Sequence, residues 1–273
     1  MSAMAPSCAW RPTTTTISTD NNKPSTDLVP ASTRFPPSVT SERRSRKPSQ
    51  SAVLCAPCTV TVSFVPSTEG GEGETIRRCP TAEARRAALF PNHTSQLQYS
   101  IHKPGRHLRR ELALVLPDAL DKSAGGGTPF PTAAQLRPDL LVIPLFQQSA
   151  HELVAVTPET NWERDLLLDY VHSLATRIVA ILSARGYWAD LTDPASGYPS
   201  FSSRGTSLYP DVDGAASLLR YATVQAGCCR VLVHPKWGTR SYPSTMFCAA
   251  PVEVVSEVVR DVCGRKVPLV QVR

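Results

Sequence analysis

The stretch that decides the fold is TNWERDLLLDYVHSLATRIVAILSARGYWA, residues 160–189. Its apolar residues recur every three or four positions and form one stripe, as in a helix that packs on a core. Thr160 and Glu163 have the spacing of a capping box at a helix start, and Gly186 stands where a C′ glycine ends a helix. We therefore predict a helix followed by an extended segment. The stripe consists of Leu167, Val171, Leu174, Ile178 and Ile181.

The segments around this helix predict a mixed α+β domain over residues 139–273. Apolar runs at 140–146 and 151–156 indicate a hairpin, with Pro144 at an edge or bulged position because proline donates no N–H. Residues 191–215 are rich in Pro, Gly, Ser and Asp and predict a long loop, which in a compact domain is often functional. The remaining predicted elements are a helix at 213–225, a buried strand at 229–233, its neighbour at 245–249, and a helix or strand at 252–260.

The N-terminal half has a different composition. Residues 1–50 hold 17 Ser or Thr and 7 Pro, with too few large apolar residues to offset the entropy of ordering, so we expect a disordered tail. Residues 51–138 predict a poorly defined region that contains one strand pattern at 51–65 and a linker around the glycines at 125–127. We expect the domain boundary near Pro138.

The charge distribution argues against a nucleic-acid partner. The chain has a formal net charge of +6, but residues 139–273 carry 12 basic and 13 acidic residues and are therefore neutral. No membrane span is expected either, because the longest apolar candidate, 166–184, contains Asp169, His172 and Arg177. Residues 1–19 have one arginine and no acid, which is compatible with a mitochondrial transit peptide.

The chain contains eight cysteines, and without a secretory signal their thiols are expected to be reduced. Cys55 and Cys58 have the C-x-x-C spacing of redox and zinc sites. A tetrahedral zinc site needs four ligands, yet no second C-x-x-C follows. Phosphate-binding glycine loops, the G-x-S-x-G elbow and the H-E-x-x-H helix are also absent from the sequence, which disfavours nucleotide-driven chemistry and these hydrolase classes.

The segment GCCRV at 227–231 is the strongest candidate site. Adjacent strand residues point to opposite faces, so we expect one thiol to be available and the other to be buried. Gly227 permits close approach of a bulky ligand, which favours Cys228 as the available thiol and Cys229 as the buried one. A thiolate is a soft ligand suited to a late transition metal. The alternative is that both cysteines are small core residues.

His234 lies six residues after Cys228. The two residues are candidates for a nucleophilic Cys/His pair, with Asp190 or Asp193 as the group that orients the histidine. The alternative is a histidine that ends a strand with ordinary hydrogen bonds. Three aromatic residues are candidates for a binding pocket or for apolar anchors at strand edges: Tyr187, Trp188 and Trp237.

Five motifs occur in order across about 55 residues: GYWAD (186–190), DPASG (193–197), SLY (207–209), GCCRV (227–231) and HPKWGT (234–239). In this order and spacing they resemble the MMADHC (CblD) family of cobalamin-trafficking proteins. A weaker likeness runs from residue 140 to residue 255. The loop at 198–204 departs from the family pattern, so contacts made by that loop are not transferred.

The resemblance implies a modified nitroreductase-like domain that binds no flavin and is not an enzyme. It implies a CblC-type (MMACHC) partner that carries cobalamin, whose cobalt is coordinated by the first cysteine of the motif, here Cys228. Gly227 and Trp237 are then expected beside the cobalamin. Cobalamin would be directed to methionine synthase in the cytoplasm and, through the N-terminal part, to methylmalonyl-CoA mutase in mitochondria. The alternative is a flavin- or thiol-dependent oxidoreductase of nitroreductase-like fold.

Overall fold

The computed structural model describes residues 51–65, 94–121, 132–227 and 229–268. All of them belong to one compact unit, residues 46–273. The predictions of a disordered tail over 1–50, of a linker at residues 125–127 and of Cys228 as a site residue lie outside the described residues.

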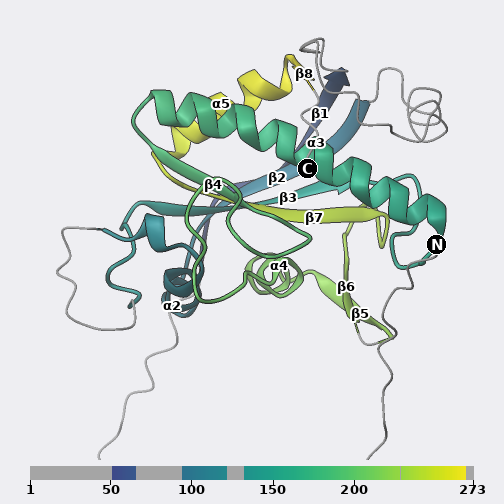
Figure 1. The fold of residues 1–273 in the computed structure, drawn as a ribbon, viewed down its shortest axis with the longest axis horizontal. Coiled ribbons are helices and arrows are strands. Elements are labelled where there is room, and N and C mark those ends of the chain that lie inside the picture. Colours follow the sequence, from purple (N-terminus) through teal and green to yellow (C-terminus); the bar gives the residue numbers. More distant parts are fainter. Residues whose placement is uncertain (1–50, 66–93, 122–131, 228, 269–273) are drawn as a thin grey trace, which may run out of the picture. The chain divides into compact units, whose positions relative to one another are not determined.

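A six-stranded sheet forms the centre of this unit, with the strand order β4-β7-β3-β2-β1-β8 (Figure 1). All neighbours are antiparallel except β1 and β8, which are parallel. A separate two-stranded sheet pairs β5 with β6. The strands are β1 (Ala52–Val65), β2 (Thr94–Lys103), β3 (Leu140–Gln148), β4 (Trp188–Thr192), β5 (Ala222–Ala226), β6 (Cys229–Val233), β7 (Ser241–Ala249) and β8 (Lys266–Pro268).

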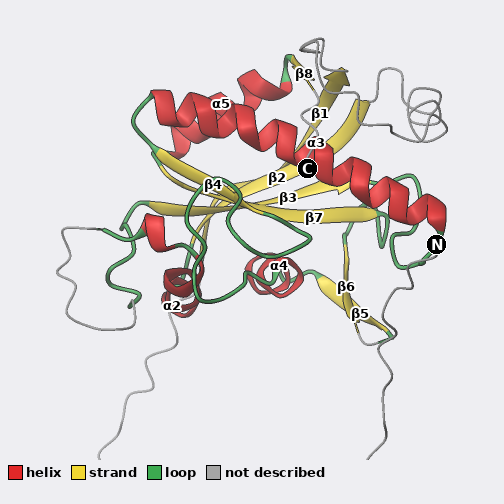
Figure 2. Ribbon diagram, viewed as in Figure 1, coloured by secondary structure: helices red, strands yellow, loops and turns green. Residues whose placement is uncertain are grey.

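Helices cover both faces of the sheet (Figure 2). The long α3 (Pro158–Ala184) and α5 (Val252–Cys263) lie on one face, and α2 (Arg106–Val115) and α4 (Asp211–Leu219) lie on the other. A short 3-10 helix, η1 (Pro117–Ala119), follows α2. Alternate residues of β3 enter the two cores, so Leu141 packs under α3 and α5 whereas Val142 packs under α2. Burial on both faces explains why this strand is a continuous apolar run.

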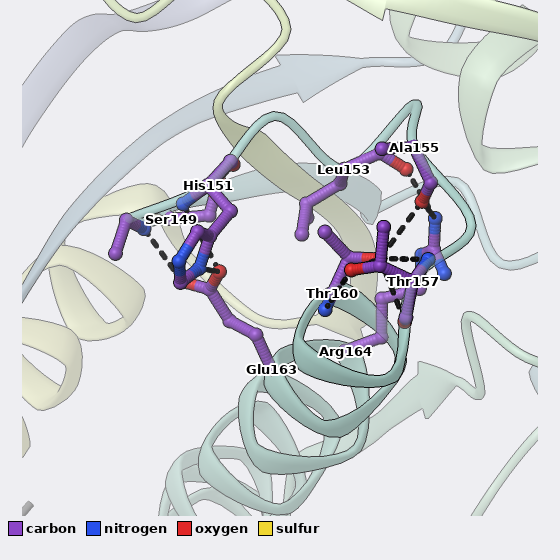
Figure 3. Close-up of polar contacts among 9 residues, drawn as sticks. Ser149, His151, Leu153, Ala155, Thr157, Thr160, Glu163 and Arg164 are labelled. Carbon is purple, nitrogen blue, oxygen red and sulfur yellow. Dashed lines mark hydrogen bonds and ion pairs between the residues drawn. The ribbon is translucent and has the colours of Figure 1, made fainter. Parts of the chain in front are cut away.

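Helix α3 confirms the predicted helix but begins one turn earlier. Its N-cap is Thr157, which forms a capping box with Thr160, and the carboxylate of Glu163 instead accepts hydrogen bonds from the N–H groups of Ala150 and His151 (Figure 3). At its other end Gly186 has φ 82°, and its N–H donates to the carbonyl of Ser183, as predicted for a C′ glycine.

Helix α3 is also long and apolar enough to cross a membrane by length and composition alone. More than half of its most apolar stretch is buried inside the protein, as in the core helix of a globular domain. This helix is therefore weak evidence for a membrane span.

The predicted hairpin of 140–146 with 151–156 is wrong. Strand β3 pairs with β2 and β7, and residues 151–156 form turns before α3. Pro144 accordingly lies in a central strand, where it is opposite Thr245 of β7. The domain boundary expected near Pro138 is not a boundary of the sheet, because β1 and β2 precede it in sequence, β2 pairs with β3, and β1 pairs with β2.

The C-terminal predictions are confirmed in part. The helix expected at 213–225 ends at Leu219, where Arg220 adopts φ 57°, and β5 follows it. Strand β6 is present, but its neighbour is β5, whereas β7 belongs to the main sheet. Residues 252–263 form the helix α5. The α+β class is thus confirmed, and the likeness to nitroreductases stays a prediction.

Candidate functional site: the β5–β6 hairpin

The predicted site lies at the tip of the hairpin that β5 and β6 form. Ala226 pairs with Cys229, so the two strands are joined over only two positions. Gly227 is the first of these and has φ 60°, a conformation that side-chain-bearing residues rarely adopt. A Cβ at Gly227 would meet no atom within 4 Å. The backbone turn therefore accounts for this glycine, whereas we expected it to allow close approach of a ligand.

Cys229 is exposed, which contradicts the expectation that it is buried. Alternation along a strand buries every second residue only where a core covers one face. At the tip of this ribbon no core does so, and the first residues of β6 are exposed. Leu232 is the buried residue of the strand, 3% exposed, near the base of the hairpin.

A small aromatic cluster holds the base of the hairpin to the sheet. Trp237 is 7% exposed and packs with Leu232 and with Phe146 of β3. Its ring stacks on His234 with 4.3 Å between centroids, and Tyr221 meets the same histidine edge to face. Trp237 therefore anchors the base of the hairpin to the sheet and is not part of the exposed tip. The indole N–H has no hydrogen-bond partner in the described part of the chain.

The hydrogen bonds of His234 define its tautomer. Its Nδ1 accepts from the backbone N–H groups of Lys236 and Trp237 at 3.2 and 3.3 Å, so the ring proton resides on Nε2. Nε2 donates to Oε1 of Gln98 at 2.7 Å. Burial, with a smaller contribution from Lys236, lowers the pKa of His234 to about 4. A neutral histidine with both nitrogens occupied is a structural residue of the hairpin base.

These contacts favour the alternative to a Cys/His pair, a histidine with ordinary hydrogen bonds at the end of a strand. A general base needs a free nitrogen toward the nucleophile, and His234 has none. Asp190 is fully buried and accepts from the N–H groups of Leu191, Ser200 and Phe201, so it organises the loop after β4 rather than orienting His234. Burial raises the pKa of Asp190, while these hydrogen bonds oppose the rise.

The other recognised motifs also build this loop. Asp193 accepts from the N–H of Ala195 and from the hydroxyl of Ser196. Gly197, with φ 74°, accepts from the N–H of Tyr209, and a Cβ at this glycine would lie 3.1 Å from the Tyr209 carbonyl oxygen. The DPASG and SLY motifs therefore contact each other and form one connection between β4 and α4.

The three aromatic residues considered as a pocket do not form a single one. Trp188 packs against the core cluster that contains Leu112 and Phe247, whereas Trp237 belongs to the cluster at the hairpin base. Tyr187 and Trp188 line a cavity of about 480 Å³ that also includes Phe201. Apolar anchoring is the alternative that the structure supports.

Gln98 is a residue of this site that the sequence analysis missed. Its Oε1 accepts from His234 and also from the hydroxyl of Tyr221 at 3.2 Å. The neighbours Leu97 and Tyr99 face the other core, so strand alternation directs Gln98 to the hairpin face. The alternation of residues along β2 was visible in the sequence. The face on which Gln98 lies could be assigned only once β2 was known to belong to this sheet.

Comparison with known proteins supports the resemblance. Residues 72–262 match the model of the family described as methylmalonic aciduria and homocystinuria type D protein, MMADHC. The curated relatives include the cobalamin trafficking protein CblD of Rattus norvegicus, 30% identical over 135 residues, and that of Homo sapiens, 28% identical over 125 residues. The matches cover 50% and 46% of this chain and 44% and 42% of those proteins, so the chain spans less than half of their length. Because the family model covers more than half of the chain, this protein belongs to the MMADHC family.

Proposed function

We propose that this protein is a cobalamin-trafficking adaptor rather than an enzyme. The observation that carries the proposal is the hairpin of the GCCRV motif, whose tip is exposed and whose base is anchored, in a chain that belongs to the MMADHC family. Relatives at about 30% identity are named cobalamin trafficking proteins.

The proposed chemistry is axial coordination of cobalt by the thiolate of Cys228. The cobalt of cobalamin sits in a planar macrocycle with axial positions for ligands, and a thiolate is a suitable soft donor. Cys228 follows Gly227 and precedes Cys229, which are both exposed, so a bulky corrin ring could approach this part of the hairpin. Ala226 and Cys229, which flank the turn, are paired with each other, so the turn is held at both ends.

We further propose that cobalamin is presented by a CblC-type (MMACHC) partner. The sequence lacks the Asp-x-His-x-x-Gly signature of independent corrinoid capture. An exposed ribbon tip does not enclose a ligand by itself, so it suits insertion into a pocket of another protein. In this proposal Trp237 supports the hairpin from beneath and does not touch the corrin.

The remaining parts of the proposal rest on the resemblance to the family. The domain is taken as a modified nitroreductase-like fold without flavin. The protein delivers cobalamin to methionine synthase in the cytoplasm and to methylmalonyl-CoA mutase in mitochondria. A flavin- or thiol-dependent oxidoreductase is the competing function, and release of flavin from the purified protein on denaturation is the observation that would favour it.

The test is a visible spectrum of the full chain mixed with a cobalamin-loaded CblC-type protein. A Co–S bond alters the corrin absorption bands directly. We expect the wild-type chain to produce this change and Cys228→Ser to abolish it. Cys229→Ser is the matched control, since it removes the adjacent thiol, which is exposed. Its spectrum is expected to equal that of the wild type.

Two results would contradict the assignment. If Cys229→Ser loses the spectral change and Cys228→Ser keeps it, the ligand is the second cysteine. If both variants keep it, thiolate coordination is not the mechanism. Circular dichroism of each variant verifies that the fold is intact.

A further inference from the structure

Cys55 and Cys58 lie on β1, outside the hairpin site, and the register of β1 with β2 brings them together. Cys55 is opposite Ile101, and Cys58 is opposite Tyr99. Three positions separate the cysteines along β1, whereas only two separate their partners along β2. Ala56 and Pro57 therefore oppose a single residue, which is the definition of a β-bulge.

The bulge places both thiols on the same face of the strand. Directly opposite residues of an antiparallel pair share a face, and Ile101 and Tyr99 both belong to the core under α3 and α5. Without the extra residue, Cys55 and Cys58 would point to opposite faces. Their partners Ile101 and Tyr99 are two positions apart on β2, which in a regular strand corresponds to about 6.8 Å between Cα atoms. This spacing is at the upper end of the Cα separations that disulfides span. A disulfide also needs Cβ atoms within about 4.5 Å, so closing one between the two thiols requires β1 to bend at the bulge.

The two thiols differ from the third cysteine nearby in their access to solvent. Cys58 is exposed and Cys55 is half-buried, whereas Cys263 at the end of α5 is buried. Burial, with a contribution from the charge of Cys58, raises the pKa of Cys263 to about 12, so this thiol stays protonated and unreactive at neutral pH. The pKa of Tyr99 is also raised, first by burial and then by Cys58 and Cys55, which places both thiols within electrostatic range of its hydroxyl.

A metal site does not explain this arrangement. The described residues contain no group of three or more His, Cys, Asp or Glu side chains that could hold a metal ion. Tetrahedral zinc needs four ligands. The remaining chemistry of two neighbouring, accessible thiols is thiol–disulfide exchange.

We propose that Cys55 and Cys58 form a redox-active dithiol that low-molecular-weight disulfides, such as glutathione disulfide, oxidise to an intramolecular disulfide. The thiolate of Cys58 attacks one sulfur of glutathione disulfide and releases one glutathione thiolate. Cys55 then loses its proton and attacks the Sγ of Cys58, which releases the second glutathione. One disulfide is reduced to two thiols, and two protein thiols are oxidised to one disulfide. This site is independent of the cobalamin function.

The experiment equilibrates the purified full chain with mixtures of reduced and oxidised glutathione, in the absence of cobalamin and of any partner. Free thiols are then trapped by acid quenching and alkylation, and tryptic peptides are analysed by mass spectrometry. The peptide 47–77 contains Cys55 and Cys58 as its two cysteines, and the peptide 79–85 contains Cys79 alone, which reports the efficiency of alkylation. We expect peptide 47–77 to change from doubly alkylated to unalkylated and lighter by two hydrogen atoms as the mixture becomes oxidising.

The variants identify the pair. Cys55→Ser is expected to leave Cys58 as a mixed disulfide with glutathione, and Cys263→Ala is expected to retain the internal disulfide at the same mixing ratio as the wild type. The proposal is overturned if the wild-type peptide stays doubly alkylated at all ratios or gains only glutathione. It is also overturned if a peptide linked between Cys58 and Cys263 replaces the internal disulfide. The wild-type result decides the question even where a variant fails to fold.

Discussion

Strands β3 and β6 both contain apolar residues in sequence, yet they differ in burial and in the number of strands that pair with them. Residues 140–147 of β3 are all buried, because its neighbours are β2 and β7 and helices cover both faces. Strand β6 has one neighbour and one buried residue, Leu232. The burial of a strand thus depends on how many of its faces and edges other elements cover. The residues of the strand alone do not show which elements these are.

Because of this difference, we expect the hairpin and the main sheet to differ in local stability. An isolated two-stranded ribbon is marginally stable in water, so the hairpin depends on the cluster at its base. The main sheet is held by contacts far apart in sequence on two faces. We therefore expect the hairpin to open locally at a lower free energy than the sheet.

The largest expected effect comes from paired truncations in the two regions. Ile178 of α3 is fully buried against the sheet, and Ile178→Ala should reduce the free energy of unfolding by roughly 2–5 kcal/mol. Trp237→Ala removes a larger side chain from the hairpin base. It should nevertheless lower the global stability less than its size implies, because the hairpin can open while the sheet stays folded.

Denaturant unfolding combined with amide hydrogen exchange checks this pair. Trp237→Ala should accelerate exchange in residues 222–233 much more than in β3. Ile178→Ala should accelerate exchange in both regions alike. Equal acceleration of β3 and the hairpin in Trp237→Ala would show that the two regions unfold as one unit.

The same contrast explains which parts of the fold could be predicted. The helix α3 and its end at Gly186 are determined by periodicity and by local backbone bonds, so the sequence suffices for them. The hairpin of 140–146 with 151–156 was wrong because strand pairing is decided by long-range contacts. For the same reason the strand pattern at 51–65 was assigned to a poorly defined region, although β1 pairs with β2 and β8 of the main sheet.

The candidate site follows the same rule. The tip position of Gly227 agrees with a local property, its positive φ. The exposure of Cys229 could not be predicted, because strand alternation buries a residue only where a core covers one face, and the sequence does not show that no core covers the tip of β6. The roles of His234 and Gln98 depend on a contact between residues that are distant in sequence. The motifs pointed to this candidate site, but the contacts at its base depend on the three-dimensional fold.

The hairpin base should also be sensitive to acid. The pKa of His234 is lowered to about 4 in the folded protein, against an ordinary value of about 6.5. Because the unfolded chain binds the proton more readily, the contribution of His234 to stability is present above about pH 6.5 and is lost as the pH falls toward about 4. Protonation would also direct an N–H from Nδ1 at the backbone donors of Lys236 and Trp237.

We expect this one residue to account for roughly 1–2 kcal/mol of stability lost between about pH 7 and pH 5. Thermal unfolding of the wild type and of His234→Gln at both pH values measures it, since the variant cannot titrate. The difference between the two proteins should narrow at the lower pH. A difference that is independent of pH would mean that His234 does not titrate in this range.

The smallest effect is expected for the ion pair that links the hairpin to α4. Arg230 of β6 donates to the carboxylate of Asp213 and, at 2.9 Å, to the hydroxyl of Thr223. Both charged side chains are about half exposed, 52% and 54%, so solvent and salt screen their attraction. Arg230→Ala should therefore change the free energy of unfolding by less than about 1 kcal/mol. The free energy of unfolding of Arg230→Lys, which retains the charge, should fall between those of this variant and the wild type.

Hydrogen exchange shows which contact holds the hairpin. If the aromatic base fixes the hairpin, exchange in residues 222–233 of Arg230→Ala will stay close to that of the wild type, in contrast to Trp237→Ala. Exchange as fast as in Trp237→Ala would mean that the ion pair, and not the aromatic cluster, holds the ribbon to the sheet.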